Sequence, residues 1–258
     1  MYREERLRMI LDIISKEKTI VVQDLAERFN LSPASIRLDL AELHDLGLVH
    51  RTHGGAIIPS ETQSIFIFDN TNLRQHDKNH IEEKRKIAEA VVDLIHDGDI
   101  VMIDGGSTNH LIARQLGRKN GLTIITPSVY LLSILSQNTN GNIFLTGGLY
   151  VSKFYDFVGE MCLENIERFN PDVAIIGIDG VSVQQGLTLM EPATEQVKRK
   201  MISVSKNLII PADSSKVGKT FPIHIVEINK INTLVTDSNI STEDANAFRE
   251  IGLKVIIA

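Results

Sequence analysis

Four short loops in the second half of the sequence combine the residue types that bind phosphate groups and sugar hydroxyls. Each follows an apolar run that predicts a strand, and together they contain hydroxyl side chains, glycines and a lysine. Glycine lets the backbone approach a ligand closely, and N–H groups at a helix start bind anions. We therefore expect a phosphate and polyol site with no metal and no cofactor. The loops are Asp104-Gly105-Gly106-Ser107-Thr108, Thr126-Pro127-Ser128, Thr146-Gly147-Gly148 and Asp213-Ser214-Ser215-Lys216.

The elements that would position these loops alternate regularly from residue 81 onward. Apolar runs such as 99–104 and 122–126 predict strands, and amphipathic segments such as 81–95 and 107–116 predict helices. This alternation is typical of an α/β fold with a doubly wound, mostly parallel sheet. Ligands bind such sheets at the carboxyl ends of the strands, so the four loops are expected to converge there.

Each loop taken alone is a weak signal. A D-G-G-S-T turn is often a simple strand-to-helix connection, and a D-S-S-K loop also suits a solvated turn. The first loop matches neither G-x-G-x-x-G nor a P-loop, so a nucleotide site is poorly supported. The presence of four such loops at equivalent strand ends is what favours a binding site.

Residues 1–58 predict three short helices followed by a glycine-containing hairpin, the outline of a winged helix-turn-helix. Leu7, Ile10, Leu11 and Ile14 form one apolar stripe in the first helix. Ser32 offers an N-cap for the third helix, and Gly47 is expected to follow its end.

The third helix is expected to enter the major groove of double-stranded DNA. At 100° per residue, Ile36, Leu40 and Leu43 face the core, and a small mixed face points outward. Arg37 can donate to guanine or phosphate, and an outward Leu38 suits a thymine methyl. The expected DNA-contacting residues are Ser32, Ala34, Ser35, Arg37 and Leu38 on the helix, and Arg51, His53 and Gly54 on the wing.

Charge does not favour DNA binding over an ordinary three-helix packing unit. Residues 1–58 hold eight Lys and Arg against nine Asp and Glu, a net charge of −1, and the whole chain carries −6. A DNA-binding domain usually has a basic footprint. From spacing alone, both readings of this domain stay open.

Composition indicates a globular, cytoplasmic protein. Hydrophobic residues make up 43% of the chain, no apolar run reaches membrane-spanning length, and the charged N-terminus does not resemble a signal peptide. Cys162 is the one cysteine, which excludes an internal disulfide and a cysteine-based zinc site; we expect it to pack in a helix. We expect residues 59–80 to form a linker whose apolar patch, including Phe66 and Phe68, couples the domains at 1–58 and 81–258.

Residues 3–56 resemble the DNA-binding domain of the DeoR family of repressors. The family pattern places S-x-x-T-I-R-R-D-L on the third helix and R-x-x-G-G-A on the wing. Here Ser35 replaces the threonine and keeps its hydroxyl, whereas Leu38 replaces the second arginine and removes a basic contact. The matching residues are Asp24-Leu25-Ala26, Ser32, Ser35-Ile36-Arg37, Asp39-Leu40, Leu43, Gly47, Arg51 and Gly54-Gly55-Ala56.

Residues 81–258 resemble the effector domain of the same family, which is itself similar to ribose-5-phosphate isomerase. The resemblance implies that Asp179, Glu195 and Lys198 join the site. The sequence departs from the family pattern at Pro127, where the family commonly has Asn. The residues that carry it are Asp104-Gly105-Gly106-Ser107-Thr108, Thr146-Gly147-Gly148, Gly159, Gly177, Asp179-Gly180, Gly186-Leu187, Glu195, Lys198 and Ala212-Asp213-Ser214-Ser215-Lys216.

Comparison with the isomerase favours a sensor over an enzyme. At the strand end that carries acids in the isomerase, this chain has Ile176 and Gly180, and its following loop, Gln184-Gln185-Gly186, lacks the lysine. Asp179 and Glu195 remain, although capping or a salt bridge would also explain them. Proton transfer between adjacent carbons needs a base and electrophilic help, and the missing acid and lysine argue against this chemistry.

The resemblance therefore implies a transcriptional repressor of a carbohydrate operon that is relieved by a phosphorylated sugar. Its partners would be a double-stranded DNA operator, the sugar phosphate and further copies of the chain, as a dimer or tetramer, with no membrane. A sugar-phosphate isomerase with a DNA-binding appendage is the alternative, and a helix-turn-helix used for protein contact is a third reading. The sequence does not name the sugar or the operator.

Overall fold

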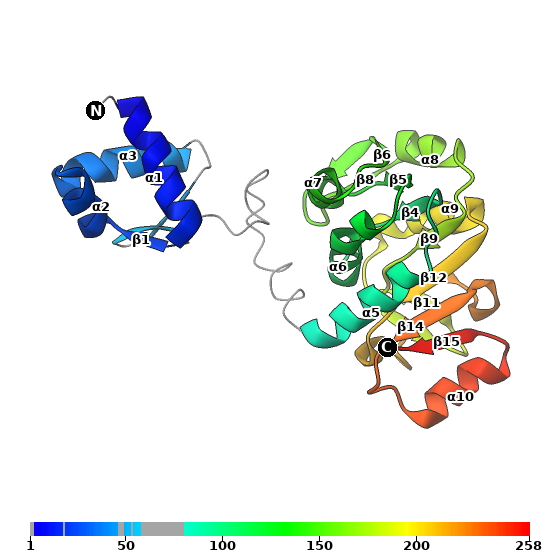
Figure 1. The fold of residues 1–258 in the computed structure, drawn as a ribbon. Coiled ribbons are helices and arrows are strands. Elements are labelled where there is room, and N and C mark those ends of the chain that lie inside the picture. The colour runs from blue at the N-terminus through cyan, green and yellow to red at the C-terminus, as the bar shows by residue number, and fades with distance from the viewer. Residues whose placement is uncertain (1–2, 18, 46–48, 53, 58–79) are drawn as a thin grey trace. The chain divides into compact units, whose positions relative to one another are not determined.

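The computed structural model describes residues 3–17, 19–45, 49–52, 54–57 and 80–258, which fall into two compact units (Figure 1). The units divide between Asp69 and Asn70. The predicted linker at 59–80, including Phe66 and Phe68, lies outside the described residues apart from His80, as do Gly47 and His53.

The first unit is a winged helix, as predicted. Ile36, Leu40 and Leu43 are buried, which confirms the inward face of the third helix. The strands pair antiparallel in the order β1-β3-β2, so β1 joins the predicted hairpin as a third strand. The elements are α1 (Arg3–Glu17), β1 (Thr19–Val21), α2 (Val22–Phe29), α3 (Pro33–Asp45), β2 (His50–Thr52) and β3 (Gly55–Ile57).

The second unit is built on a seven-stranded, wholly parallel sheet in the order β15-β14-β12-β9-β4-β5-β6. The helices and strands of this sheet alternate as predicted. They are α5 (Ile81–Asp93), β4 (Ile100–Ile103), α6 (Ser107–Gln115), β5 (Thr123–Thr126), α7 (Val129–Asn138), β6 (Asn142–Leu145), α8 (Glu160–Glu167), β9 (Val173–Ile175), α9 (Glu195–Val204), β12 (Asn207–Pro211), β14 (Thr233–Thr236), α10 (Thr242–Glu250) and β15 (Lys254–Ile257).

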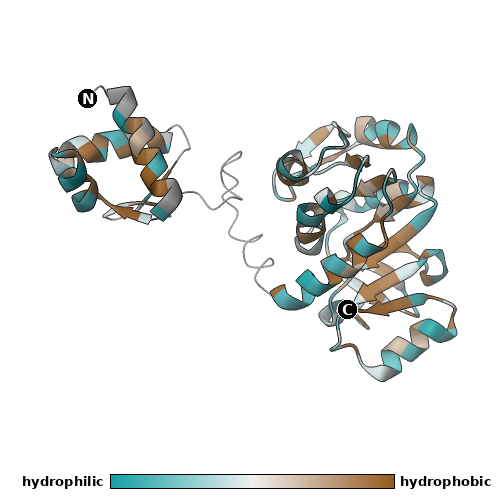
Figure 2. Ribbon diagram, viewed as in Figure 1, coloured by the Kyte–Doolittle hydropathy of each residue, from teal (hydrophilic) through white to brown (hydrophobic). Residues whose placement is uncertain are grey.

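Side chains that alternate along the strands fill two separate cores, one on each face of the sheet. Val101 and Ile103 of β4 pack with α5, α6 and α7, whereas Met102 packs on the opposite face with α8, α9 and α10. Figure 2 shows these strands as largely hydrophobic, as expected for a sheet covered on both faces. This arrangement confirms the doubly wound prediction.

The second unit also contains smaller strands and 3₁₀ helices, which the sequence pattern did not predict. They form an antiparallel sheet in the order β10-β11-β13 and a β7-β8 hairpin. Their bounds are β7 (Leu149–Val151), β8 (Asp156–Val158), β10 (Gly180–Ser182), β11 (Gly186–Leu189) and β13 (Ile223–Val226), with short 3₁₀ helices η1 (Leu116–Arg118), η2 (Pro192–Thr194), η3 (Ser214–Lys216) and η4 (Ile228–Lys230).

Candidate functional site

The outer face of α3 is presented to solvent. Arg37 and Ala34 are exposed, Ser35 is half-buried, and the apolar Leu38 is 67% exposed. Ser32 caps the helix, because its hydroxyl accepts a hydrogen bond from the Ser35 N–H at 3.2 Å. The predicted reading face is therefore available for contact with a partner.

A buried ion pair fixes α3 against α1. Asp39 is 1% exposed, and its carboxylate accepts two hydrogen bonds from the Arg6 guanidinium, at 2.6 and 2.9 Å. The negative charge of Asp39 is therefore neutralised inside the domain and does not face a partner. A second acid, Glu17, is paired with Arg28. Each pair joins one positive and one negative charge, so the net charge of residues 1–58 stays at −1.

The wing presents a polar strand beside a tightly packed one. Arg51 on β2 and Gly54 are exposed, whereas His53 lies outside the described residues. The Gly54 carbonyl accepts a hydrogen bond from the Val22 N–H at 2.8 Å, which ties the wing to α2. A Cβ atom at Gly55 would lie 1.9 Å from the Ile20 carbonyl oxygen, so only glycine fits between β3 and β1.

In the second unit, the carboxyl ends of β4 and β9 meet where the strand order reverses. The chain adds β5 and β6 on one side of β4, and then β9, β12, β14 and β15 on the other. Doubly wound sheets bind ligands in the crevice at such a switch point. Asp104 follows β4 and Gly177 lies beyond β9, so the predicted Asp104 loop is at this point.

A network of hydrogen bonds joins the loops at the switch point. Asp104 Oδ1 accepts from the Gly177 N–H at 2.8 Å and from Asn109 Nδ2 at 2.6 Å, and Oδ2 forms an ion pair with Lys198. Lys198 Nζ also donates to the Gly177 carbonyl at 2.9 Å. Asp104 and Lys198 are buried, so each charge depends on the other for compensation.

The loops that follow β4 and β6, at the carboxyl edge of the sheet, contain predicted residues that we call the glycine-rich rim. Gly105, Gly106, Ser107 and Thr108 are half-buried, and α6 begins at Ser107 directly after Gly106, whose φ is +140°. The α6 start therefore leaves N–H groups available to an anion. Gly147 and Gly148 also have positive φ, at +69° and +117°.

Thr126 and Ser128 shape the rim from inside. Both are fully buried, and the Thr126 hydroxyl accepts a hydrogen bond from the Ser128 N–H at 3.1 Å. Thr126 is the last residue of β5, and Ser128 directly precedes α7.

Three predicted residues lie apart from the Asp104 network. Lys216 Nζ is 3.9 Å from Asp179 Oδ1, and Asp179 Oδ2 accepts from the Met190 N–H at 2.8 Å. Glu195 pairs with Arg199 one turn along α9. Within the described part of the chain, no hydrogen bond or ion pair joins these three residues to Asp104. The binding roles of all the predicted residues stay predictions.

Sequence reasoning missed two residues of this region, Asn109 and Asp156. Asn109 donates to Asp104, and its place directly after the Ser107-Thr108 pair was an available signal. Asp156 is buried at the start of β8, and its carboxyl group touches Gly105. Nothing in its local sequence, Lys153-Phe154-Tyr155-Asp156, indicates this position, because the β7-β8 hairpin has no clear strand or turn pattern.

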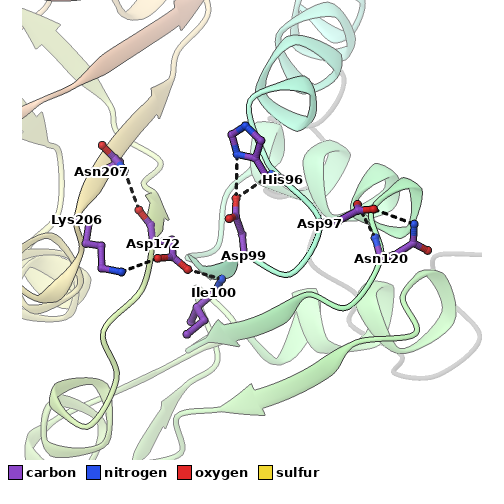
Figure 3. A network of polar contacts seen from close by, with 8 residues as sticks. All are labelled: His96, Asp97, Asp99, Ile100, Asn120, Asp172, Lys206 and Asn207. Atoms are coloured by element: carbon purple, nitrogen blue, oxygen red, sulfur yellow. Dashed lines mark hydrogen bonds and ion pairs between the residues drawn. The ribbon is translucent and has the colours of Figure 1, made fainter.

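The opposite edge of the sheet, at the amino ends of the strands, carries polar groups that pair with one another (Figure 3). Asp172 accepts from the Ile100 N–H at 3.0 Å and from Lys206 Nζ at 2.7 Å, and these bonds hold the pKa of its carboxyl below the usual range. Asp97 binds the Asn120 N–H and side-chain amide. The donors and acceptors of these residues are used in hydrogen bonds within the fold. The candidate site therefore lies at the carboxyl ends of the strands.

The described residues provide no metal centre and no membrane segment. No group of three or more His, Cys, Asp or Glu side chains among them is arranged to hold a metal ion. Within the same ranges, no helix combines the length and the apolar character needed to cross a bilayer. Cys162 is part of α8 and is buried in the core, as its predicted packing role requires.

Two family models match the chain. One, described as the DeoR C-terminal sensor domain, covers residues 79–238, and the other, described as a DeoR-like helix-turn-helix domain, covers residues 6–62.

Curated relatives match over nearly the full length. The HTH-type transcriptional repressor GlcR of Bacillus subtilis is 35% identical over 92% of this chain and 89% of its own length. The transcriptional repressor AccR of Agrobacterium fabrum is 30% identical over 99% and 97%. The glycerol-3-phosphate regulon repressor of Escherichia coli is 29% identical over 92% of both.

Among solved structures, the chain is similar to ribose-5-phosphate isomerases. The enzyme from Methanocaldococcus jannaschii is 18% identical, with a TM-score of 0.40 over 54% of this chain and 55% of that one. A D-ribose-5-phosphate isomerase in complex with phospho-erythronic acid has the same TM-score at 17% identity, over 53% and 54%. The similarity is confined to the fold.

Proposed function

The chain belongs to the DeoR family of transcriptional repressors, and on this premise we propose that it represses a carbohydrate catabolic operon until a phosphorylated sugar binds its sensor domain. We assign residues 1–58 to operator binding, 59–80 to a linker and 81–258 to effector binding. Such a regulator acts in the cytoplasm, where its operator is.

The observation that carries the effector proposal is the glycine-rich rim over the Asp104 network at the switch point. The phosphate would bind the N–H groups and hydroxyls of Ser107 and Thr108 at the start of α6. Lys198 is already committed to Asp104, so Lys216 is the cation we assign to the ligand. The sugar hydroxyls would meet the surrounding donors and acceptors. The remaining residues assigned to this site are Asp104, Gly105, Gly106, Thr126, Ser128, Gly147, Gly148, Asp179 and Glu195.

For the operator, α3 would lie in the major groove and the wing along the backbone. Arg37 and Leu38 would contact bases, and Arg51 would contact a phosphate. Ser32, Ala34, Ser35, His53 and Gly54 complete the assigned interface. A near-neutral domain binds weakly as one copy, so we infer a homo-oligomer that engages repeated half-sites together.

Sugar-phosphate isomerase activity is the second candidate function, but the acidic side chains available for proton transfer already have partners. Asp104 is locked by Lys198, Asp179 accepts a backbone hydrogen bond, and Glu195 pairs with Arg199. The matching relatives described above are named as repressors. An aldose–ketose phosphate turnover assay tests this candidate, and we expect no turnover above background.

A thermal-shift screen tests the effector proposal. The full chain would be heated with hexose, hexitol, ketose and amino-sugar phosphates, each beside its unphosphorylated counterpart. A ligand at 100 times its dissociation constant stabilises the native state by about 2.7 kcal/mol, which raises the melting temperature by several degrees. We expect a phosphorylated sugar to raise the melting temperature and its unphosphorylated counterpart to leave it unchanged. Equal shifts from both forms would contradict a phosphate-based site.

A further inference from the structure

Asp156 is a buried acid that lies against the glycine loop before α6. It is 5% exposed, and a Cβ atom at Gly105 would lie 2.9 Å from its Oδ1. The preceding residue, Tyr155, has a φ of +57°, which is unfavourable for a bulky side chain. The structure thus holds a strained backbone where it places a carboxyl group beside the candidate anion site.

Asp156 lacks the partners that compensate the negative charge of Asp104. Asp104 is satisfied by Lys198, Gly177 and Asn109, whereas Asp156 Oδ1 finds no hydrogen-bond partner among the described residues. With Lys198 committed to Asp104, an ionised Asp156 leaves one buried negative charge unbalanced. An unpaired buried charge is unfavourable, and it is removed most simply by a proton.

The groups around Asp156 act on its pKa in both directions, and the burial of its carboxyl group has the largest effect. Burial raises the pKa of Asp156 to about 7; the charge of Asp104 adds to the shift, while Lys198 and the Ser128 hydroxyl oppose it. Tyr150 and Cys162 also sense Asp156, and both have pKa values raised above their ordinary ones, so they remain neutral near pH 7. Asp156 therefore changes charge near neutrality.

We propose that Asp156 couples effector binding to the uptake of a proton, so that an anionic group binds at the start of α6 together with a protonated Asp156. This inference rests on the proposed function. An ionised Asp156 repels an anion at the neighbouring N–H groups, whereas the protonated carboxyl is neutral and offers its O–H as a donor. The anion in turn favours the protonated form.

The sign and size of the effect follow from proton linkage. A site that binds an anion only when Asp156 is protonated is available in about nine tenths of molecules at pH 6 and about one tenth at pH 8, if the pKa is about 7. Anion affinity should therefore fall about tenfold as the pH rises from 6 to 8.

Sulfate is the probe that tests this, because phosphate esters themselves change charge near pH 6. Its affinity for the full chain would be measured by calorimetry at pH 6 and 8, in two buffers of different ionisation enthalpy. We expect the tenfold loss of affinity, with net proton uptake at pH 7. In Asp156→Asn, sulfate should bind equally at both pH values and without uptake attributable to residue 156.

Two controls separate this inference from other sources of pH dependence. Histidines also titrate in this range, and Asp156→Asn retains all of them, so a pH dependence caused by histidines would persist unchanged in that variant. Ser107→Glu places a carboxylate on the N–H groups at the start of α6, where it suits the helix, and should abolish sulfate binding.

The outcomes are distinct. If sulfate binds with the same pH dependence in the wild-type chain and in Asp156→Asn, the inference is wrong while the effector site stands. If sulfate binds neither protein at either pH, or if Ser107→Glu binds it as well as wild type, the anion site of the proposed function fails, and this inference fails with it.

Discussion

Leu38 leaves 67% of its side chain in solvent on the face of α3 that we assign to the operator. An apolar side chain in that position gains nothing from the fold, and a thymine methyl group is the feature of the major groove that it suits. Its place next to Arg37 pairs one apolar reader with one hydrogen-bonding reader. This predicts an operator in which a thymine methyl contributes to affinity.

Removing either partner of that contact should weaken binding by about 1 kcal/mol, or about fivefold. Leu38→Ala removes the side chain, and replacement of the thymine by uracil removes only the methyl. We expect the two changes together to cost no more than either alone, measured by fluorescence anisotropy at fixed salt with operator selected from a random library. Met9→Ala, at an exposed apolar residue of α1, is the control variant. Fully additive losses for every thymine would contradict the contact.

Lys216 supplies the cation of the proposed effector site. Its Nζ lies 3.9 Å from Asp179, and its side chain is 29% exposed, so it is near enough to solvent to meet a ligand. Lys216→Ala should lower the affinity for the sugar phosphate by about 10- to 100-fold, as expected for a lost hydrogen bond to a charged group. The affinity for the operator should be unchanged. Lys206→Ala, at the opposite edge of the sheet, is the matched control. An undiminished effector response in Lys216→Ala would remove this residue from the site.

At the residue scale, the sequence was informative where a periodic pattern fixes direction. The helical period placed Ile36, Leu40 and Leu43 inward and Leu38 outward, and the structure agrees. It was uninformative for Asp156, because this side chain reaches Gly105 through a tertiary contact about 50 residues away in the sequence. Local patterns carry no record of such contacts.

At the scale of elements, the wing depends on one close approach between strands. Gly55 pairs with Val21 across β3 and β1, and any side chain there meets the Ile20 carbonyl. Gly54, next to it, has nothing within 4 Å of where a Cβ would lie. Adjacent glycines therefore have different roles: one permits strand pairing, and the other is free to approach a partner.

Gly55→Ala should destabilise the wing by about 1–3 kcal/mol, because β1 and β3 must separate to admit the methyl group. Gly54→Ala should change stability by less than about 0.5 kcal/mol. Amide hydrogen exchange of β1 and β3 in the full chain measures both. Stability is the readout because Gly54 is itself assigned to the operator interface. Equal protection in the two variants would show that the close approach is unimportant.

The parallel strands could be predicted because each is a continuous apolar run between amphipathic helices. β7, β8, β10 and β13 could not, since they do not alternate with amphipathic helices as the parallel strands do. The pairing of β1 with β3 was also missed, because a three-residue strand next to a helix has no pattern of its own. Asp156 is the first residue of β8, one of these short strands, so the candidate site was only partly predictable.

At the scale of the whole molecule, the account requires that ligand occupancy of the sensor domain changes operator binding. A ligand does this only through different affinities for two arrangements of the oligomer. Residues 59–80 are our candidate for the coupling segment, and Phe66 and Phe68 lie in its apolar patch. Replacing both with Ser should abolish the effector response without abolishing sugar-phosphate binding. An unchanged response would place the coupling elsewhere.

The most direct test is the operator dissociation constant of the full chain, at one stated salt concentration, with and without a saturating sugar phosphate from the thermal-shift screen. We predict that the ligand weakens operator binding at least tenfold. Saturating operator should weaken ligand binding by the same factor, as linkage requires. An operator affinity that stays within twofold while the sensor domain is saturated would contradict the account.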